Sequence, residues 1–374
     1  MNILFLNFKR EWTGPAAWMV IASEGLRNRG HDAWTLSSTA SKHYVRDPHK
    51  EWLVPSPPRS KFDPRTLQLV LRLVKEHQID VIVANSPREI ILGGLAGKLC
   101  RVPVVRRIGL AKDLLKNGKH KFLHQIFVQR SIVPAEDVKR EILERFTHFD
   151  PDKFAVIHNG RATLPSTPDS RASERESLGI PPEAFVFGCN ARLNVQKRHD
   201  GTIRAFAEIA KMAQNAHLVL TGEGGRQEEL ETLALVLGLA DRIHFPGYTT
   251  EPMKRCHAYD VYVSNSEHEG FPNAIVEAMG TGLPVIATNV NGTGEIVRDE
   301  ENGLLIPFGD HEALVHAMRR MIEDSALRTR LGDEALKIVS ERFSDSKMID
   351  SIEQVLHLAI ECSAFAQNRV HEKS

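Results

Sequence analysis

The sequence predicts an α/β protein made of two doubly wound domains, each built on a parallel sheet. Short apolar runs alternate with segments of helical periodicity from the first residue onward, which is the pattern of βαβ units. A stretch rich in proline and serine, residues 161–184, interrupts the alternation, and a second alternation follows it. The 374 residues suffice for two domains that each bury a core of their own.

In the first half, apolar runs bounded by polar or turn-forming residues predict the strands. These runs are residues 1–8, 32–38, 80–86, 102–108, 131–136 and 154–160. Apolar residues that recur every three or four positions predict the helices between them, at residues 15–30, 66–77 and 88–100. Alternation of this kind favours a parallel sheet with helices on its faces.

The second half repeats the pattern after the linker. The predicted strands are residues 184–190, 216–225, 242–248, 259–266 and 303–310, and the predicted helices include 201–213, 226–238 and 348–366. We therefore predict an N-terminal domain over 1–164, a C-terminal domain over 165–345, and a last segment, 346–374, that packs back on the first domain. Ligands bind beyond the carboxyl ends of parallel strands, so we expect the site in a cleft between the domains.

The composition narrows the class of protein. Hydrophobic residues make up 42% of the chain and charged residues 26%, which is typical of a soluble globular protein, and no apolar run reaches the length of a membrane span. The opening residues are expected to form a buried strand rather than a signal peptide. The four cysteines are scattered without metal-ligand spacing, which indicates free thiols in the cytosol.

Charge is unevenly distributed although the formal net charge is zero. Residues 1–164 hold 27 Lys and Arg against 16 Asp and Glu, and residues 106–130 alone hold seven against one. A basic half favours an anionic partner, such as a phosphorylated glycan, nucleic acid or an acidic membrane face. The alternative is an ordinary solvated surface.

Two glutamates stand eight residues apart in the stretch HEGFPNAIVEAMGTGLPVIAT, which begins at residue 268. Pro272 suits the first turn of a helix, and free amides there form an anion site. Glu277 lies in an apolar run, where a carboxylate needs partners. A ligand with a diphosphate for the amides and hydroxyls for Glu269 and Glu277 satisfies all these groups, as a nucleotide sugar does. The plainer alternative is a first-turn acid and a solvated glutamate.

This stretch resembles the E-x7-E signature of retaining glycosyltransferases of family 4, the group 1 glycosyl transferases, which have the GT-B fold. Further segments resemble the family in the same order, namely VIHNG (156–160), NARLNVQKRHDGTIRAF (190–206), LVLTGEGGRQEEL (218–230), RIHFPGY (242–248), NGLLIPFGD (302–310) and FSDSKMIDSIEQ (343–354). The likeness covers the second half nearly end to end and the first half weakly.

The resemblance implies roles for individual residues. It places Glu277 at the ribose hydroxyls of the donor and Glu269 at the donor sugar. It also implies that Arg192 and Lys197 clamp the diphosphate, where fixed cations stabilise the charge of the leaving nucleotide and replace a metal ion. The other implied donor contacts are Gly14, Gly270, Phe271, Pro272 and Asn273.

Two segments depart from the family pattern. The family often has a Gly-Gly loop after the first strand, but here only Gly14 of EWTGPAAW is retained. Trp12 beside it is a candidate for stacking on the acceptor, or else a core residue. Where many members place a histidine after the fourth strand, this chain has Arg106 and Arg107, either of which is a candidate to meet a phosphate of donor or acceptor.

The resemblance therefore implies a metal-independent retaining glycosyltransferase that moves a sugar from a UDP- or GDP-sugar to a glycan or lipid-linked acceptor in cell-envelope polysaccharide or lipopolysaccharide synthesis. We expect a cytoplasmic enzyme, peripheral on the inner membrane face, with no nucleic-acid partner. The alternatives are a nucleotide-sugar epimerase of the same fold and a non-catalytic nucleotide-sugar-binding subunit. A nicotinamide dehydrogenase is less favoured, because the glycine-rich fingerprint after the first strand is missing.

Overall fold

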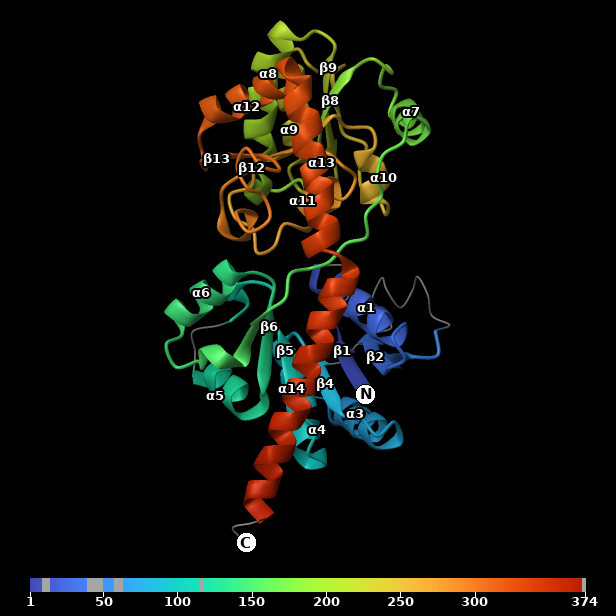
Figure 1. Cartoon of the computed structure of the whole chain (residues 1–374), viewed down its shortest axis with the longest axis vertical. Coiled ribbons are helices and arrows are strands. Elements are labelled where there is room, and N and C mark those ends of the chain that lie inside the picture. Colours follow the sequence, from blue (N-terminus) through green and yellow to red (C-terminus); the bar gives the residue numbers. More distant parts are fainter. Residues whose placement is uncertain (9–13, 39–49, 57–62, 115–117, 372–374) are drawn as a thin grey trace. The chain divides into compact units, whose positions relative to one another are not determined.

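A computed structural model describes residues 1–8, 14–38, 50–56, 63–114 and 118–371 of the chain (Figure 1). The chain divides into two compact units, Met1–Asn159 with Asp345–Ser374, and Gly160–Ser344. Each unit contains one sheet whose strands are all parallel, with helices packed against it. The predicted fold class, two doubly wound α/β domains, is confirmed.

The first unit has a seven-stranded sheet in the order β3-β2-β1-β4-β5-β6-β7. The strands are β1 Asn2–Asn7, β2 Asp32–Ser38, β3 Leu53–Ser56, β4 Val81–Ala84, β5 Val104–Arg107, β6 Arg130–Val133 and β7 Phe154–Val156. Between β1 and β4 the order reverses, since β1 leads outward to β2 and β3 while β4 begins the other half. Such a reversal is the ligand-binding position of a doubly wound sheet.

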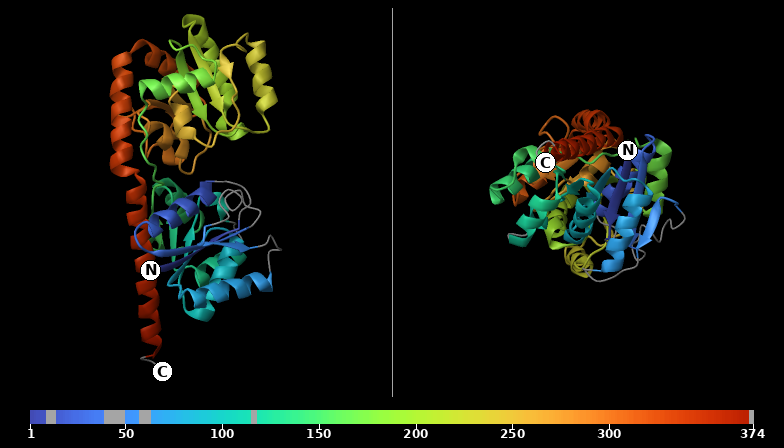
Figure 2. Two further views of the ribbon diagram at one scale, coloured as in Figure 1. Left: turned by 90° about the vertical axis from the view of Figure 1, so that its right-hand side faces the viewer. Right: turned by 90° about the horizontal axis from the view of Figure 1, so that it is seen from below.

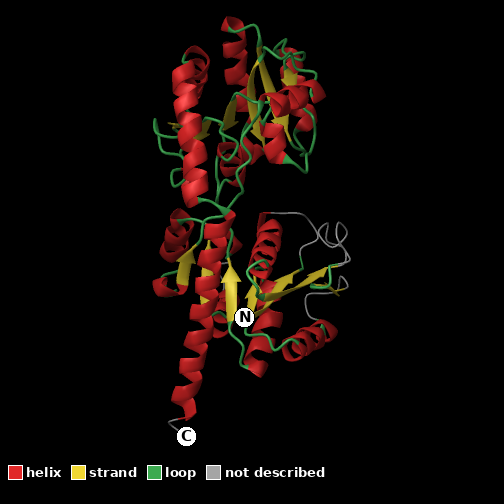
Figure 3. Ribbon diagram, turned by 45° about the vertical axis from the view of Figure 1, so that its right-hand side comes forward, coloured by secondary structure: helices red, strands yellow, loops and turns green. Residues whose placement is uncertain are grey.

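Helices cover both faces of this sheet (Figure 3). They are α1 Gly14–Arg27, α3 Pro64–Glu76, α4 Pro87–Cys100, α5 Gly118–Phe127, α6 Glu136–Arg145 and α14 Asp345–His371, with short 3₁₀ turns η1 Ala111–Asp113 and η2 Pro151–Lys153. One face packs against α1 and α14, and the other packs against α3 and α4. The last helix, α14, therefore completes the core of the first unit (Figure 2).

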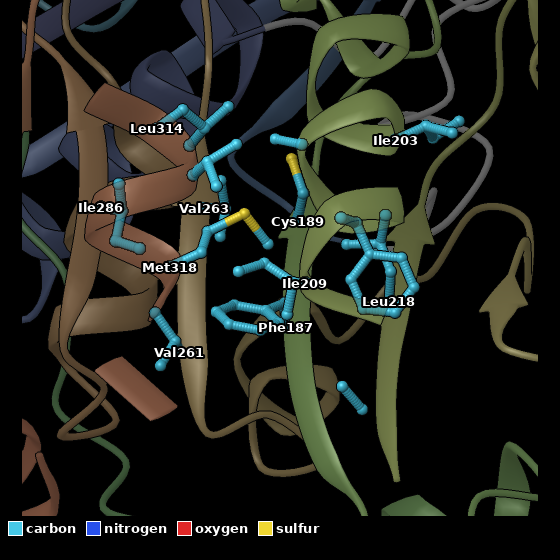
Figure 4. Packing of buried hydrophobic residues seen from close by; sticks show 14 of the residues in the cluster. Phe187, Cys189, Ile203, Ile209, Leu218, Val261, Val263, Ile286, Leu314 and Met318 are labelled. Carbon is cyan, nitrogen blue, oxygen red and sulfur yellow. The ribbon is translucent and has the colours of Figure 1, made fainter. Parts of the chain in front are cut away.

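The second unit has a six-stranded sheet in the order β10-β9-β8-β11-β12-β13. The strands are β8 Phe185–Asn190, β9 Ala216–Thr221, β10 Ile243–His244, β11 Val261–Ser264, β12 Val285–Thr288 and β13 Leu304–Ile306. The helices are α7 Pro168–Ser177, α8 His199–Met212, α9 Gln227–Val236, α10 Pro252–Cys256, α11 Asn273–Met279, α12 His311–Glu323 and α13 Ser325–Arg342, with 3₁₀ turns η3 Val195–Lys197 and η4 Asn291–Thr293. Apolar residues of β8, β9, β11 and β12 pack against α8 and α12 to form its main core (Figure 4).

Several elements were not predicted from the sequence, and for two of them, α7 and β3, the residues show why. The predicted linker contains α7, whose Thr167 N-cap and Ser170 form a capping box ahead of Pro168 in the first turn. Strand β3 was not predicted, because its Pro55 argues against a central strand. The strand lies at the edge of the sheet, where a missing backbone donor is tolerated.

The basic segment 106–130 is less exposed than a solvated basic helix would be. His124 in α5 is 4% exposed, its Nε2 lies 2.9 Å from the Ser131 hydroxyl, and its ring lies 4.3 Å from that of Phe149. His124 is therefore part of the packed interior of the first unit, although a histidine in so basic a segment would be expected on a solvated helix face. Among the helices that the structure describes, none is both long and apolar enough to cross a membrane.

Candidate functional site

The order of strands in the second sheet brings β8 and β11 side by side at the point where the order reverses. The connection from β8 leads toward β9, and the connection from β11 leads toward β12 on the opposite side. The loops that follow these two strands, residues 191–198 and 265–272, therefore leave the same edge of the sheet in different directions. This edge is where an open α/β sheet binds its ligand.

Close backbone contacts fix the first of these loops. The Leu193 amide donates to the Glu223 carbonyl at 3.0 Å, and the Arg226 amide donates back to the Leu193 carbonyl at 3.1 Å. A Cβ on Gly222 would lie 2.0 Å from the Ala191 carbonyl oxygen, and Gly222 has a φ of +143°. Only glycine fits at position 222, and it allows the backbone after β9 to pack directly against the loop that follows β8.

His199, at the start of α8, fastens the same loop from its other end. Its Nε2 donates to the Arg192 carbonyl at 3.2 Å, and the side chain is almost fully buried. Burial lowers the pKa of His199 to about 4, so the ring is neutral at neutral pH. The sequence motif contains this histidine, but nothing in the sequence singled it out.

Lys197 and Glu269 form an ion pair between the two loops. The Lys197 ammonium lies 2.5 Å from the Glu269 carboxylate, whose residue is 8% exposed. Two hydrogen bonds support the pair, from Gln196 Nε2 to the His268 carbonyl at 2.5 Å and from the Glu267 amide to the Gln196 carbonyl at 2.8 Å. The loops 191–198 and 265–272 are thus joined through Lys197 and Glu269, the two residues that were predicted to bind the diphosphate and the donor sugar.

Glu277 has a partner that the sequence did not reveal. Arg161 Nε donates to its carboxylate at 2.8 Å, and the side chains of both residues are about one-sixth exposed, at 16% and 15%. The Arg161 backbone amide donates to the Phe343 carbonyl, and the Phe343 ring lies 6.2 Å from that of Phe271. The Glu277 carboxylate is therefore held in a fixed position and has its charge matched.

The other predicted donor residues of the second unit lie beside these pairs in sequence and differ in exposure. Gly270, Phe271 and Pro272 are buried, and Pro272 occupies the N-cap of α11. The Asn273 amide donates to the Phe271 carbonyl at 2.9 Å, so this donor has an internal acceptor in the present structure. Arg192 is exposed.

Two of the residues predicted in the first unit lie at the carboxyl end of one of its strands. Arg106 and Arg107 end β5 and are 2% and 4% exposed. Burial lowers the pKa of each guanidinium to about 10. Gly14 is the first residue of α1, and Trp12 lies outside the described residues.

The arrangement in the second unit combines two carboxylates with three cations. Glu269 and Glu277 can accept hydrogen bonds from sugar hydroxyls, while Lys197 and Arg192 can bind phosphate oxygens. Within the described residues no group of three or more His, Cys, Asp or Glu side chains is arranged to hold a metal ion. The chemistry that these side chains offer is therefore binding and electrostatic stabilisation of an anionic, hydroxyl-rich ligand.

Two family models match the chain in adjacent regions. Residues 170–338 match the model described as glycosyl transferases group 1, and residues 14–163 match the model described as Glycosyltransferase Family 4.

The chain is also similar to individual glycosyltransferases. The lipopolysaccharide core biosynthesis glycosyltransferase LpsD of Rhizobium meliloti is 35% identical over 52% of this chain, and the chain spans only about half, 55%, of that relative's length. The UDP-Gal:alpha-D-GlcNAc-diphosphoundecaprenol alpha-1,3-galactosyltransferase of Escherichia coli is 29% identical over 78% of this chain and 79% of its own.

Among solved structures, Anabaena Alr3699/HepE in complex with UDP has a TM-score of 0.83 and 23% identity, covering 96% of this chain and all of that one. At 23% identity, this likeness shows that the two proteins share a fold, and it does not by itself show a shared reaction.

Proposed function

Because this chain belongs to the glycosyl transferases of group 1 and family 4 and has the GT-B fold, we propose that it is a retaining glycosyltransferase. It transfers a sugar from a nucleoside diphosphate, a UDP-sugar in our proposal, to a glycan or lipid-linked acceptor. The second unit binds the donor, and the first unit binds the acceptor.

The observation that carries the proposal is the pair of charge-matched carboxylates at the switch point of the second sheet. Glu269 is paired with Lys197, and Glu277 is paired with Arg161. In the proposed complex Glu277 accepts from the ribose hydroxyls and Glu269 from the sugar. Lys197 and Arg192 stabilise the negative charge that appears on the diphosphate when the sugar–phosphate bond breaks.

Donor and acceptor classes follow the printed names of the similar proteins. One relative uses UDP-galactose and a diphosphoundecaprenol acceptor, and a protein of the same fold binds UDP. LpsD acts in lipopolysaccharide core biosynthesis. We therefore propose a metal-independent step in cell-envelope glycan synthesis, carried out by an enzyme that lies peripherally on an anionic membrane surface.

The first test is a thermal-shift panel of the intact protein with UDP, GDP, ADP, TDP, CMP and NAD, without metal and then with magnesium. A ligand at 100 times its dissociation constant stabilises by about 2.7 kcal/mol, which is a measurable shift. We expect UDP to raise the melting temperature without metal. A response to NAD alone, or to none of the nucleotides, would contradict the proposed donor site.

Removing the Glu277 carboxylate should weaken nucleotide binding. Glu277→Ala removes the proposed ribose acceptor and leaves the Arg161 guanidinium without its partner, so we expect UDP affinity to fall about 10- to 100-fold, the range for hydrogen bonds to charged groups. Isothermal titration calorimetry with UDP measures the change. Glu267→Ala is the matched control, since Glu267 is an exposed glutamate nearby, and it should bind UDP normally. Equal affinities for the two variants would exclude the ribose role.

A further inference from the structure

In the first unit, one row of polar side chains lies at the switch point of the sheet, and its two outer members, Asn7 and Arg107, are buried. The registers β1–β4 and β4–β5 align Phe5 with Val83 and Ala84 with Arg106. Continued along the strands, they put Asn7, Asn85 and Arg107 side by side on three neighbouring strands. Residues in one row of a parallel sheet face the same side, here the side covered by α1.

Several donors on this face have no acceptor. Arg107 Nη1, Asn7 Nδ2 and Trp18 Nε1 are all buried atoms without a hydrogen-bond partner in the described part of the chain. Their residues are 4%, 3% and 3% exposed, and the Arg107 guanidinium lies over the Trp18 ring at 5.6 Å. A cation over an aromatic ring gains some stabilisation, but its N–H groups still need acceptors.

Another buried arginine shows how the same chain satisfies this side chain when it is structural. Arg175 is 2% exposed, and its Nη2 donates to Asp260 at 2.8 Å while its Nε donates to the Ala258 carbonyl at 3.1 Å. For Arg107 the carboxylate whose charge favours the protonated form is that of Asp113, which is exposed and already accepts a hydrogen bond from the Leu110 amide. Leaving one N–H group of a buried guanidinium and two further donors without acceptors is costly unless a ligand supplies the acceptors.

We propose that Arg107, Asn7 and Trp18 form a subsite for an anionic oxygen group, a phosphate or a carboxylate, carried by the acceptor. The missing partners are all acceptors, so the ligand must present oxygens and a negative charge. Neutral sugar hydroxyls would leave the guanidinium charge unmatched. That the anion belongs to an acceptor rests on the proposed function; the subsite itself does not.

The test compares Arg107→Met with Lys112→Gln, a change at an exposed cation of the same unit. Inorganic phosphate, acetate and neutral glycerol are titrated at constant ionic strength in the presence of UDP. UDP occupies the proposed nucleotide site of the second unit, so that added phosphate cannot bind there. We expect phosphate, acetate or both to raise the melting temperature of the parent protein and of Lys112→Gln. For Arg107→Met the half-saturating concentration should rise at least about tenfold. Which anion binds more tightly identifies the group.

A second readout separates a binding role from a structural one. Without added anion, Arg107→Met should melt at the same temperature as the parent protein or higher, because it removes an unmatched buried charge. A lower melting temperature together with an unchanged phosphate response would overturn the subsite. UDP binding by Arg107→Met serves as the folding check. If the parent protein did not bind UDP, the proposed function would be contradicted, but the case for an anion subsite at Arg107 would not be affected.

Discussion

Lys197→Met should reduce the turnover of sugar transfer about 10²- to 10³-fold, the cost of removing one preorganised group that stabilises developing charge. The Lys197 ammonium is fixed by its ion pair with Glu269 and by the short 3₁₀ turn that ends at this residue. It therefore needs little rearrangement when negative charge grows on the diphosphate. UDP affinity should fall much less than turnover, because the interaction is strongest in the transition state.

Steady-state and single-turnover kinetics with the donor sugar identified by the nucleotide panel measure this effect. Lys211→Met is the matched control, since Lys211 is an exposed lysine of α8 in the same unit, and its activity should be unchanged. Lys197→Arg should retain part of the activity because it keeps a cation. If Lys197→Met lowered UDP affinity and left turnover intact, the lysine would serve in ground-state binding only.

Both sheets could be predicted from the sequence because parallel strands are buried on both faces and appear as continuous apolar runs. The helix α7 could not be predicted, because it has no apolar stripe. It is held instead by arginines: Arg171 and Arg175 both bind Asp260, and Arg175 also binds backbone carbonyls. Contacts of this kind do not require apolar residues at every third or fourth position. The sequence of the segment therefore resembles that of a linker.

The candidate site was only partly predictable for a similar reason. The motif around Glu269 and Glu277 is local, and the loop with Lys197 is a second local motif. The partnership of Arg161 with Glu277 spans 116 residues, and no single sequence shows such a pairing. The burial of Arg107 was hidden as well, since a run of basic residues usually indicates a solvated surface.

The protein should lose stability steeply between pH 6.5 and about 4, because burial keeps histidines of both units in the neutral form, His124 and His199 most completely among those with a lowered pKa. Burial lowers the pKa of His124 to about 3 and that of His199 to about 4, whereas the unfolded chain binds these protons near pH 6.5. Above pH 6.5 both states are neutral and nothing is lost. As the pH falls below that value, only the unfolded state gains protons, so the free energy of unfolding decreases.

At pH 5 each histidine should cost about 2 kcal/mol relative to pH 8, which is large against a typical stability of about 5–15 kcal/mol. His124 lies in the first unit and His199 in the second, so each unit should lose its own share. Urea unfolding at pH 8 and pH 5, followed separately for the two units, measures the loss. His124→Gln should flatten the pH dependence of the first unit, while His357→Gln, a change at an exposed histidine of α14, should leave it unchanged. An equal slope in both variants would mean that His124 takes up its proton without unfolding.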